Sequence, residues 1–89
     1  MNYKLAENIS WREIDGQILI LDPRINKKAH ELSPVASYIW LALSNDKEIN
    51  EITDELIIHY QSEKQGTEIK NDIDLFLNEM LELKLIHHD

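Results

Sequence analysis

The sequence has no cysteine, and this absence excludes several classes of protein at once. Without thiols the chain has no disulfide framework, thiolate-bound zinc, iron–sulfur cluster or cysteine nucleophile, and a cytoplasmic location is the simplest expectation. Glycine and proline are also scarce, with two of each in 89 residues, while 43% of the residues are apolar. This composition predicts one folded domain over residues 1–89 rather than a disordered chain.

Basic residues and long apolar runs are scarce too. Nine Lys and Arg stand against seventeen Asp and Glu, so the net charge is −8. Because binding to phosphates depends on neutralisation by basic side chains, nucleic acid is not expected as a partner. Even the longest purely apolar run, residues 38–43, is far shorter than a membrane span, and the N-terminus lacks the apolar segment of a signal peptide. We therefore expect a soluble protein with no membrane partner.

The motifs of catalysis and metal binding are missing as well. No nucleophile elbow and no glycine-rich phosphate loop occurs, and the carboxylates are spread along predicted helical faces. The four histidines are His30, His59, His87 and His88, and none of them has the spacing of a metal site. His87 and His88 are expected in a solvated C-terminal tail. We expect no catalytic residue, metal or cofactor. A binding protein fits the sequence better than an enzyme.

The first third of the chain has the pattern of a small sheet. Residues 9–14 and 17–22 are β-type runs joined by Asp15-Gly16, a pair that favours a type I′ hairpin turn. The second run has four consecutive apolar residues, which is typical of a central strand. A third strand is predicted over residues 27–32, and its polar character suits an exposed edge. These runs predict a three-stranded antiparallel sheet.

From residue 33 onward the apolar period becomes helical. Ser33 is a good N-cap for a helix over residues 34–43, and a second amphipathic helix is predicted within residues 48–61. Thr67 is the expected N-cap of a third and longest helix, which begins at residue 68. The fold class is therefore α+β and winged-helix-like, with a three-stranded antiparallel sheet followed by three helices.

The third helix has a wider apolar surface than one packing contact requires. Its narrow core face is formed by Ile69, Ile73, Phe76, Met80 and Leu83. Leu77 and Leu81 lie to one side of this stripe, flanked by Asp74 and Asn78. The extra width can form a groove that binds a partner, or it can pack on the first or second helix. The sequence leaves both alternatives open.

Four stretches resemble the PqqD-like family in their order and spacing. The first is Leu-Ser-Pro-Val-Ala-Ser-Tyr-Ile-Trp at residues 32–40, between the third strand and the first helix. The second helix carries the family pattern at Glu51, Ile52, Glu55, Leu56 and Tyr60. The third helix and its end carry it at Asp72, Ile73, Phe76, Leu77, Leu85 and Ile86. The resemblance covers residues 11–86, nearly the whole chain.

The resemblance implies a recognition element for ribosomally synthesised and post-translationally modified peptides. Such a module binds the leader segment of the precursor peptide as an added β-strand on its third strand, next to a groove formed with the third helix. It presents the rest of the precursor to a processing enzyme, such as a leader peptidase or another maturase. The expected peptide-binding residues are Lys27, Lys28, Ala29, His30, Glu31, Asp74, Leu77, Asn78 and Leu81.

Two pathways within the resemblance are distinguished by short segments. Ser-Asn-Asp at residues 44–46 stands where an Asp-Gly turn is usual, and Asp-Pro-Arg at 22–24 stands where Pro-Glu-Gly is usual. These departures disfavour the group that assists a radical SAM enzyme in pyrroloquinoline quinone synthesis, which stays the alternative. The small size and the Ile39-Trp40 pair resemble the stand-alone proteins that accompany lasso-peptide leader proteases.

Two alternatives from other classes remain. The first two helices can be a helix-turn-helix of a winged-helix DNA-binding protein, but residues 47–61 carry four carboxylates against one lysine. The chain can also be a small subunit whose apolar surface docks on an enzyme, in which case the open strand is incidental. Binding of a precursor peptide separates both from the recognition element.

Overall fold

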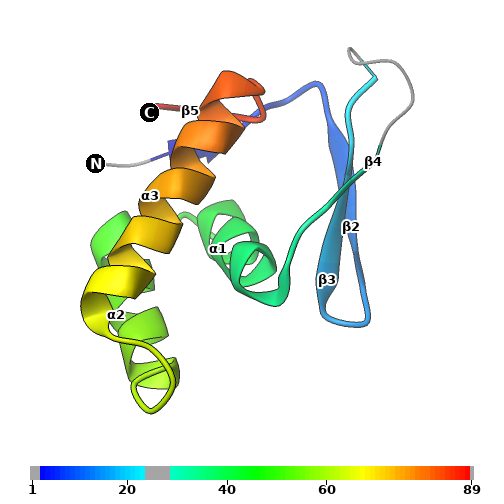
Figure 1. Cartoon of the computed structure of the whole chain (residues 1–89). Coiled ribbons are helices and arrows are strands. Elements are labelled where there is room, and N and C mark those ends of the chain that lie inside the picture. Colours follow the sequence, from blue (N-terminus) through cyan, green and yellow to red (C-terminus); the bar gives the residue numbers. More distant parts are fainter. Residues whose placement is uncertain (1–2, 24–28, 89) are drawn as a thin grey trace.

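The computed structural model describes residues 3–23 and 29–88 and has the expected α+β class (Figure 1). Its elements, in chain order, are β1 (Tyr3–Leu5), β2 (Ser10–Ile14), β3 (Gln17–Leu21), β4 (Ala29–Glu31), α1 (Pro34–Ser44), α2 (Ile49–His59), α3 (Gly66–Glu82) and β5 (Ile86–His88). The predicted three-stranded antiparallel sheet followed by three helices is confirmed.

The main sheet has the order β2-β3-β4, with both pairs antiparallel. Asp15 and Gly16 have φ values of 51° and 81°, so both central residues of the hairpin turn have the left-handed backbone conformation that a type I′ turn requires. The predicted central position of β3 is confirmed, and Ile18 and Ile20 are buried on its inner face. β4 is the edge strand. Of the expected third strand, Lys27 and Lys28 lie outside the described residues.

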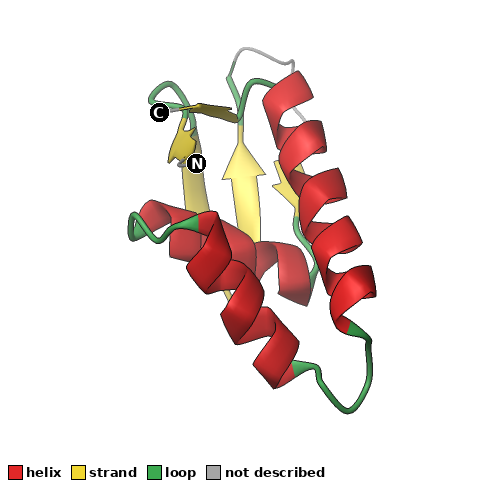
Figure 2. Cartoon of the chain, turned by 90° about the vertical axis from the view of Figure 1, so that its left-hand side faces the viewer, coloured by secondary structure: helices red, strands yellow, loops and turns green. Residues whose placement is uncertain are grey.

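A second sheet, absent from the sequence-based prediction, joins the two ends of the chain. β1 and β5 are antiparallel, with Leu5 opposite Ile86 and Tyr3 opposite His88 (Figure 2). The rings of Tyr3 and His88 are 4.9 Å apart. The expectation of a solvated histidine tail was therefore wrong: His87 and His88 have exposed side chains, but their backbone forms a strand. Three residues are too few to show a strand pattern, and the pairing partner lies at the other end of the chain.

The three helices begin by different means. Ser33 caps α1 as predicted, since its hydroxyl accepts a hydrogen bond of 3.2 Å from the backbone N–H of Ala36. The predicted cap of α3 was wrong: Thr67 lies in its first turn, and the N-cap is Gln65, whose side chain makes no capping hydrogen bond. The helix therefore begins at Gly66, next to the side chain of Ile57 in α2, without a side-chain cap. Within the described residues no helix combines the length and apolar character needed to span a bilayer.

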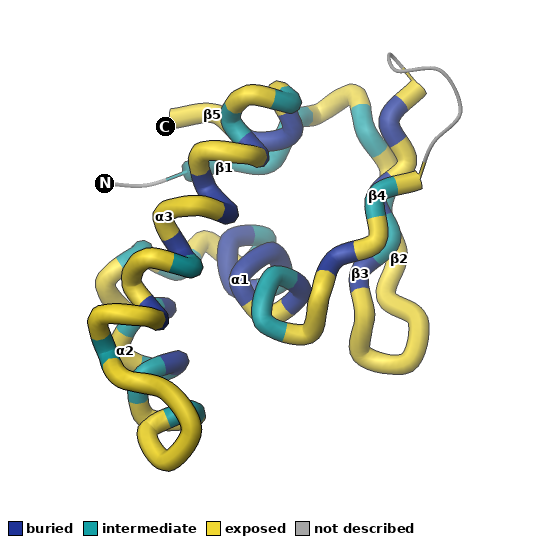
Figure 3. Tube along the Cα trace, in the orientation of Figure 1, coloured by how far each residue is buried: buried dark blue, intermediate teal, exposed yellow. Residues whose placement is uncertain are grey.

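The core lies between the main sheet and the three helices, and Figure 3 shows the concentration of buried residues on α1. Trp40 is fully buried there and meets Trp11 of β2 edge to face, with ring centroids 6.2 Å apart. Apolar contact of this kind is the main source of folding free energy. The core face predicted for the third helix is confirmed, except that Leu83 is half-buried rather than buried.

A single hydroxyl connects α1 to β3 and to the residue that follows β4. Ser37, which is 1% exposed, accepts a 2.9 Å hydrogen bond from the backbone N–H of Ile18 and donates one of 3.3 Å to the carbonyl of Leu32. The N–H of Leu32 in turn donates to the carbonyl of Ile18 at 2.9 Å. In a regular antiparallel pair, Ile18 and Leu32 would exchange both bonds directly. Here the Ser37 hydroxyl is inserted into the second bond and ties the helix to the sheet.

We expect Ser37→Ala to lower the free energy of unfolding by about 1–3 kcal/mol, because it leaves a buried amide and a buried carbonyl without partners. The matched control is Ser44→Ala, in the same helix, whose hydroxyl donates to the carbonyl of Leu41 one turn earlier. Urea unfolding followed by tryptophan fluorescence measures both variants. Equal stability of the two variants would contradict the bridging role of Ser37.

Candidate functional site

The outer edge of β4 is open among the described residues, because β4 pairs only with β3. The direction of its backbone groups follows from the ladder. Leu32 bonds toward β3, and antiparallel partners alternate between bonded and non-bonded pairs, so His30 also bonds toward β3. Ala29 and Glu31 therefore present their N–H and C=O groups outward. These groups can pair with an extended chain.

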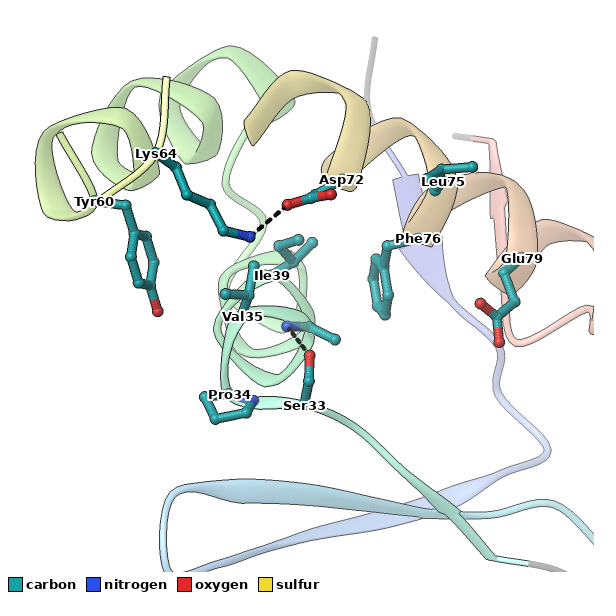
Figure 4. Close-up of a pocket in the computed structure, with 11 residues that line it drawn as sticks. Ser33, Pro34, Val35, Ile39, Tyr60, Lys64, Asp72, Leu75, Phe76 and Glu79 are labelled. Atoms are coloured by element: carbon teal, nitrogen blue, oxygen red, sulfur yellow. Dashed lines mark hydrogen bonds and ion pairs between the residues drawn. The ribbon is translucent and has the colours of Figure 1, made fainter. Parts of the chain in front are cut away.

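The chain leads directly from this edge into a groove between α1 and α3, which we call the α1–α3 groove (Figure 4). Its volume is about 520 Å³. The residues that line it are Ser33, Pro34, Val35, Ala36, Ile39, Tyr60, Lys64, Asp72, Leu75, Phe76 and Glu79. Val35, Ile39 and Phe76 supply an apolar surface, and Leu75 is 68% exposed. The groove suits an apolar side chain of a peptide.

Charged groups also line the groove. Lys64, in the loop after α2, forms an ion pair of 2.9 Å with Asp72 of α3. This hydrogen bond raises the pKa of the Lys64 ammonium. The carboxylate of Glu79 lines the groove one turn after Leu75 and Phe76. An apolar ligand residue with a basic neighbour matches this combination.

The α3 residues expected from the sequence lie elsewhere on the helix. Leu77 is 3% exposed and belongs to the core, so the packing alternative holds for this residue. Leu81 is half-buried and lines a separate hollow next to β5. Asp74 and Asn78 are exposed, and none of the four lines the α1–α3 groove. The assignment of Asp74, Asn78 and Leu81 to peptide binding stays a prediction.

Sequence reasoning missed the flank of α3 that lines the groove. Asp72, Leu75 and Glu79 lie on one side of the core stripe and line the groove with Phe76 from the stripe itself, whereas the predicted set lies on the other side. Leu75 carried the available signal, since it is an apolar residue outside the core stripe. Periodicity alone does not say which flank of a helix faces a distant strand.

Two buried ring nitrogens have no hydrogen-bond partner among the described residues. One is Nε1 of Trp40, deep in the core. The other is Nε2 of His30, a half-buried residue of the edge strand whose cross-strand partner is the buried Ile20. The inner face of the open edge strand therefore includes a polar atom with unused hydrogen-bonding capacity.

A hydrogen-bonded triad joins α1 to α2 near the groove. The hydroxyl of Tyr38 donates to Glu55 at 2.5 Å, and the Lys47 ammonium donates to the same carboxylate at 2.8 and 3.0 Å. The Lys47 hydrogen bond, followed by that of Tyr38, holds the pKa of the Glu55 carboxyl below its ordinary value. Burial, followed by the hydrogen bond to Glu55, raises the pKa of Tyr38.

Among the described residues, no group of three or more acidic or histidine side chains is placed to hold a metal ion. Their arrangement offers an open sheet edge, an apolar groove and a charged rim. The fold and the site together define a small α+β domain with the features of a binding module.

The sequence identifies the family to which this domain belongs. The family model of coenzyme PQQ synthesis protein D (PqqD) matches residues 17–86, so the chain is a member of the PqqD family. The structure is similar to that of TbiB1 in complex with the TbiA(beta) leader peptide, with a TM-score of 0.82 and 23% sequence identity over 97% of this chain and 99% of TbiB1. The two proteins share a fold. No curated protein matches the sequence.

The lowered pKa of Glu55 predicts how the stability of the protein changes with pH. Because the pKa of Glu55 is lower in the folded state, its ionised carboxylate stabilises the folded protein at pH values above the unfolded-state pKa. This stabilisation is lost as the pH falls through the folded-state pKa. We expect the Glu55 titration midpoint, measured by NMR, to rise toward its ordinary value in Lys47→Met. The control Lys64→Met removes the same charge from the ion pair with Asp72 and leaves the Glu55 midpoint unchanged. An unchanged midpoint in Lys47→Met would contradict the triad.

Proposed function

We propose that this protein binds the leader segment of a ribosomally synthesised precursor peptide by adding it as a strand to β4. The observation that carries the proposal is the open edge of β4, which continues through Ser33 into the α1–α3 groove. An open edge supplies main-chain hydrogen bonds and a neighbouring groove supplies specificity, as in other strand-addition modules. Membership of the PqqD family and the fold shared with a leader-bound protein support the same function.

Each part of the site has a role in this binding mode. Ala29 and Glu31 pair with the leader backbone, and this contact is nearly independent of sequence. Discrimination then comes from an aromatic or aliphatic leader residue that enters the groove beside Leu75 and Phe76. With a net charge of −8 and Glu79 in the groove, the protein favours basic residues next to that anchor.

The protein acts by presenting the bound precursor to a processing enzyme and has no catalytic activity of its own. Holding the leader raises the local concentration of the rest of the precursor at the enzyme. A leader protease of the lasso-peptide type is the favoured partner, and a radical SAM enzyme of pyrroloquinoline quinone synthesis is the alternative. DNA binding is disfavoured because α2 exposes Glu51 and Asp54 where phosphates would lie.

Strand addition is tested by a pair of variants at one exposed position. Ala29→Pro removes an outward N–H but no bond to β3, whereas Ala29→Val keeps the N–H and suits a strand. We expect Ala29→Pro to weaken binding about tenfold, because it leaves a leader carbonyl unpaired. Ala29→Val should bind like the parent protein. The probe is a fluorescent synthetic leader of the precursor encoded beside this chain, followed by anisotropy, and equal affinities of the two variants would exclude pairing at this edge.

A second set of variants decides which flank of α3 the peptide contacts. We expect Leu75→Ala to weaken leader binding about fivefold without changing the melting temperature, because Leu75 is 68% exposed in the groove. Leu81→Ala should lower the melting temperature, since Leu81 packs against the core. Asp74→Asn is the conservative comparison on the same flank as Leu81. Calorimetric titration that shows loss of affinity in Leu81→Ala and none in Leu75→Ala would move the peptide to that flank.

A further inference from the structure

A second open cavity lies between α1 and α2, next to the α1–α3 groove, and has a volume of about 530 Å³. Its surface includes two of the exposed large apolar side chains of the described residues, Ile58 at 67% and Tyr38 at 37% exposure. Pro34 and Tyr60 line both this cavity and the α1–α3 groove. These two residues therefore form a shared wall, and the two hollows belong to one continuous surface.

We propose that this second cavity is a further subsite for the same peptide, filled by an aliphatic or aromatic residue outside the strand-pairing segment. The inference rests on the proposed function, because the peptide must first be placed along β4. The end of the peptide that leaves β4 beside Ser33 and Pro34 enters the α1–α3 groove and then crosses the wall formed by Pro34 and Tyr60. One chain can thus place two anchors in two adjoining cavities.

The polar side of the cavity is already held in place. Glu55 lines the cavity and accepts hydrogen bonds from Tyr38 and Lys47, so the phenol ring of Tyr38 is held at the opening. A wall that is ordered before binding loses little conformational entropy when a ligand arrives. This arrangement favours a side chain that packs on the Tyr38 ring beside Ile58.

The charge around the cavity favours a basic residue next to the apolar anchor. Glu51, Glu55 and Ile58 follow one another at helical spacing on α2, and the negative charge of Glu51 acts on Lys47. Lys47 is the cation of this group, and it is already bound to Glu55. A leader with a basic residue beside its second anchor would therefore meet a favourable field here.

The peptide is a better occupant than a separate partner because of the shared wall. A processing enzyme or a second copy of the chain would have no need for a hollow that adjoins the peptide groove. In contrast, a peptide that fills the first groove can reach the second one directly, because the two cavities adjoin along one continuous chain path. All pairs in the main sheet are antiparallel, and a leader added in the same sense has its N-terminal end beside Pro34. The second anchor then precedes the strand-pairing segment in the leader.

The test uses two synthetic leader peptides, one complete and one lacking the residues before the strand-pairing segment. We expect Ile58→Ala to weaken binding of the complete leader about five- to tenfold and to leave the shortened leader unaffected. On the parent protein, the shortened leader should bind more weakly than the complete one by the same factor. The matched control is Ile14→Ala, an exposed isoleucine on β2 at the opposite edge of the sheet. Unchanged melting temperatures confirm that both variants are folded.

The outcomes separate this inference from the function on which it rests. If both peptides bind the parent protein and Ile58→Ala equally well, the second subsite is refuted while strand addition stands. If neither peptide binds the parent protein, the proposed function itself fails. If Ile58→Ala leaves both affinities unchanged but slows processing of the precursor or changes the sedimentation coefficient, the cavity belongs to an enzyme or a second copy, and the inference is overturned.

Discussion

The Ser37 hydroxyl is the contact on which the position of the binding site depends. By bonding both Ile18 and Leu32, it holds the first turns of α1 against the end of the β3–β4 ladder. The same contact sets where the chain leaves β4, so it also fixes Ser33 and Pro34 at the entrance of the α1–α3 groove. One buried side chain thus relates the open edge, which supplies main-chain hydrogen bonds, to the groove, which supplies side-chain contacts.

The open edge of β4 combines a function with a hazard. An unpaired edge can join any extended chain, and proteins limit this by making such strands short and polar. The described part of β4 has three residues, Ala29–Glu31, of which the first and last are exposed and point their backbone groups outward. Two outward positions are enough to align a peptide, but main-chain pairing alone does not distinguish one sequence from another. Selectivity then depends on the apolar cavities that follow along the surface.

The two cavities differ in how they are built. The α1–α3 groove lies between helices that meet across the core, and Phe76 reaches from that core into its lining. The cavity beyond Pro34 and Tyr60 lies on the outside of α1 and α2, where the triad of Tyr38, Glu55 and Lys47 holds the two helices together. The first is shaped by packing and the second by hydrogen bonding at the surface.

The sequence by itself determined the features that depend on near neighbours in the chain. These are the hairpin turn at Asp15-Gly16, the central position of β3, the Ser33 cap and the core stripe of α3, because local φ preferences and apolar periodicity decide each of them. The family resemblance carried in residues 32–86 follows from the same local patterns. The polar edge strand was also visible, since its composition differs from that of the central strand.

Only the tertiary structure decided the features that depend on distant parts of the chain. The β1–β5 sheet joins segments too short to have a pattern, and α3 begins at Gly66 without a capping side chain. Which flank of α3 lines the groove depends on the rotation of the helix about its axis when it packs on α1 and α2. The apolar periodicity of α3 does not determine that rotation. Leu77 therefore lies in the core and Leu75 lies in the groove, although both are leucines at the border of the same apolar stripe.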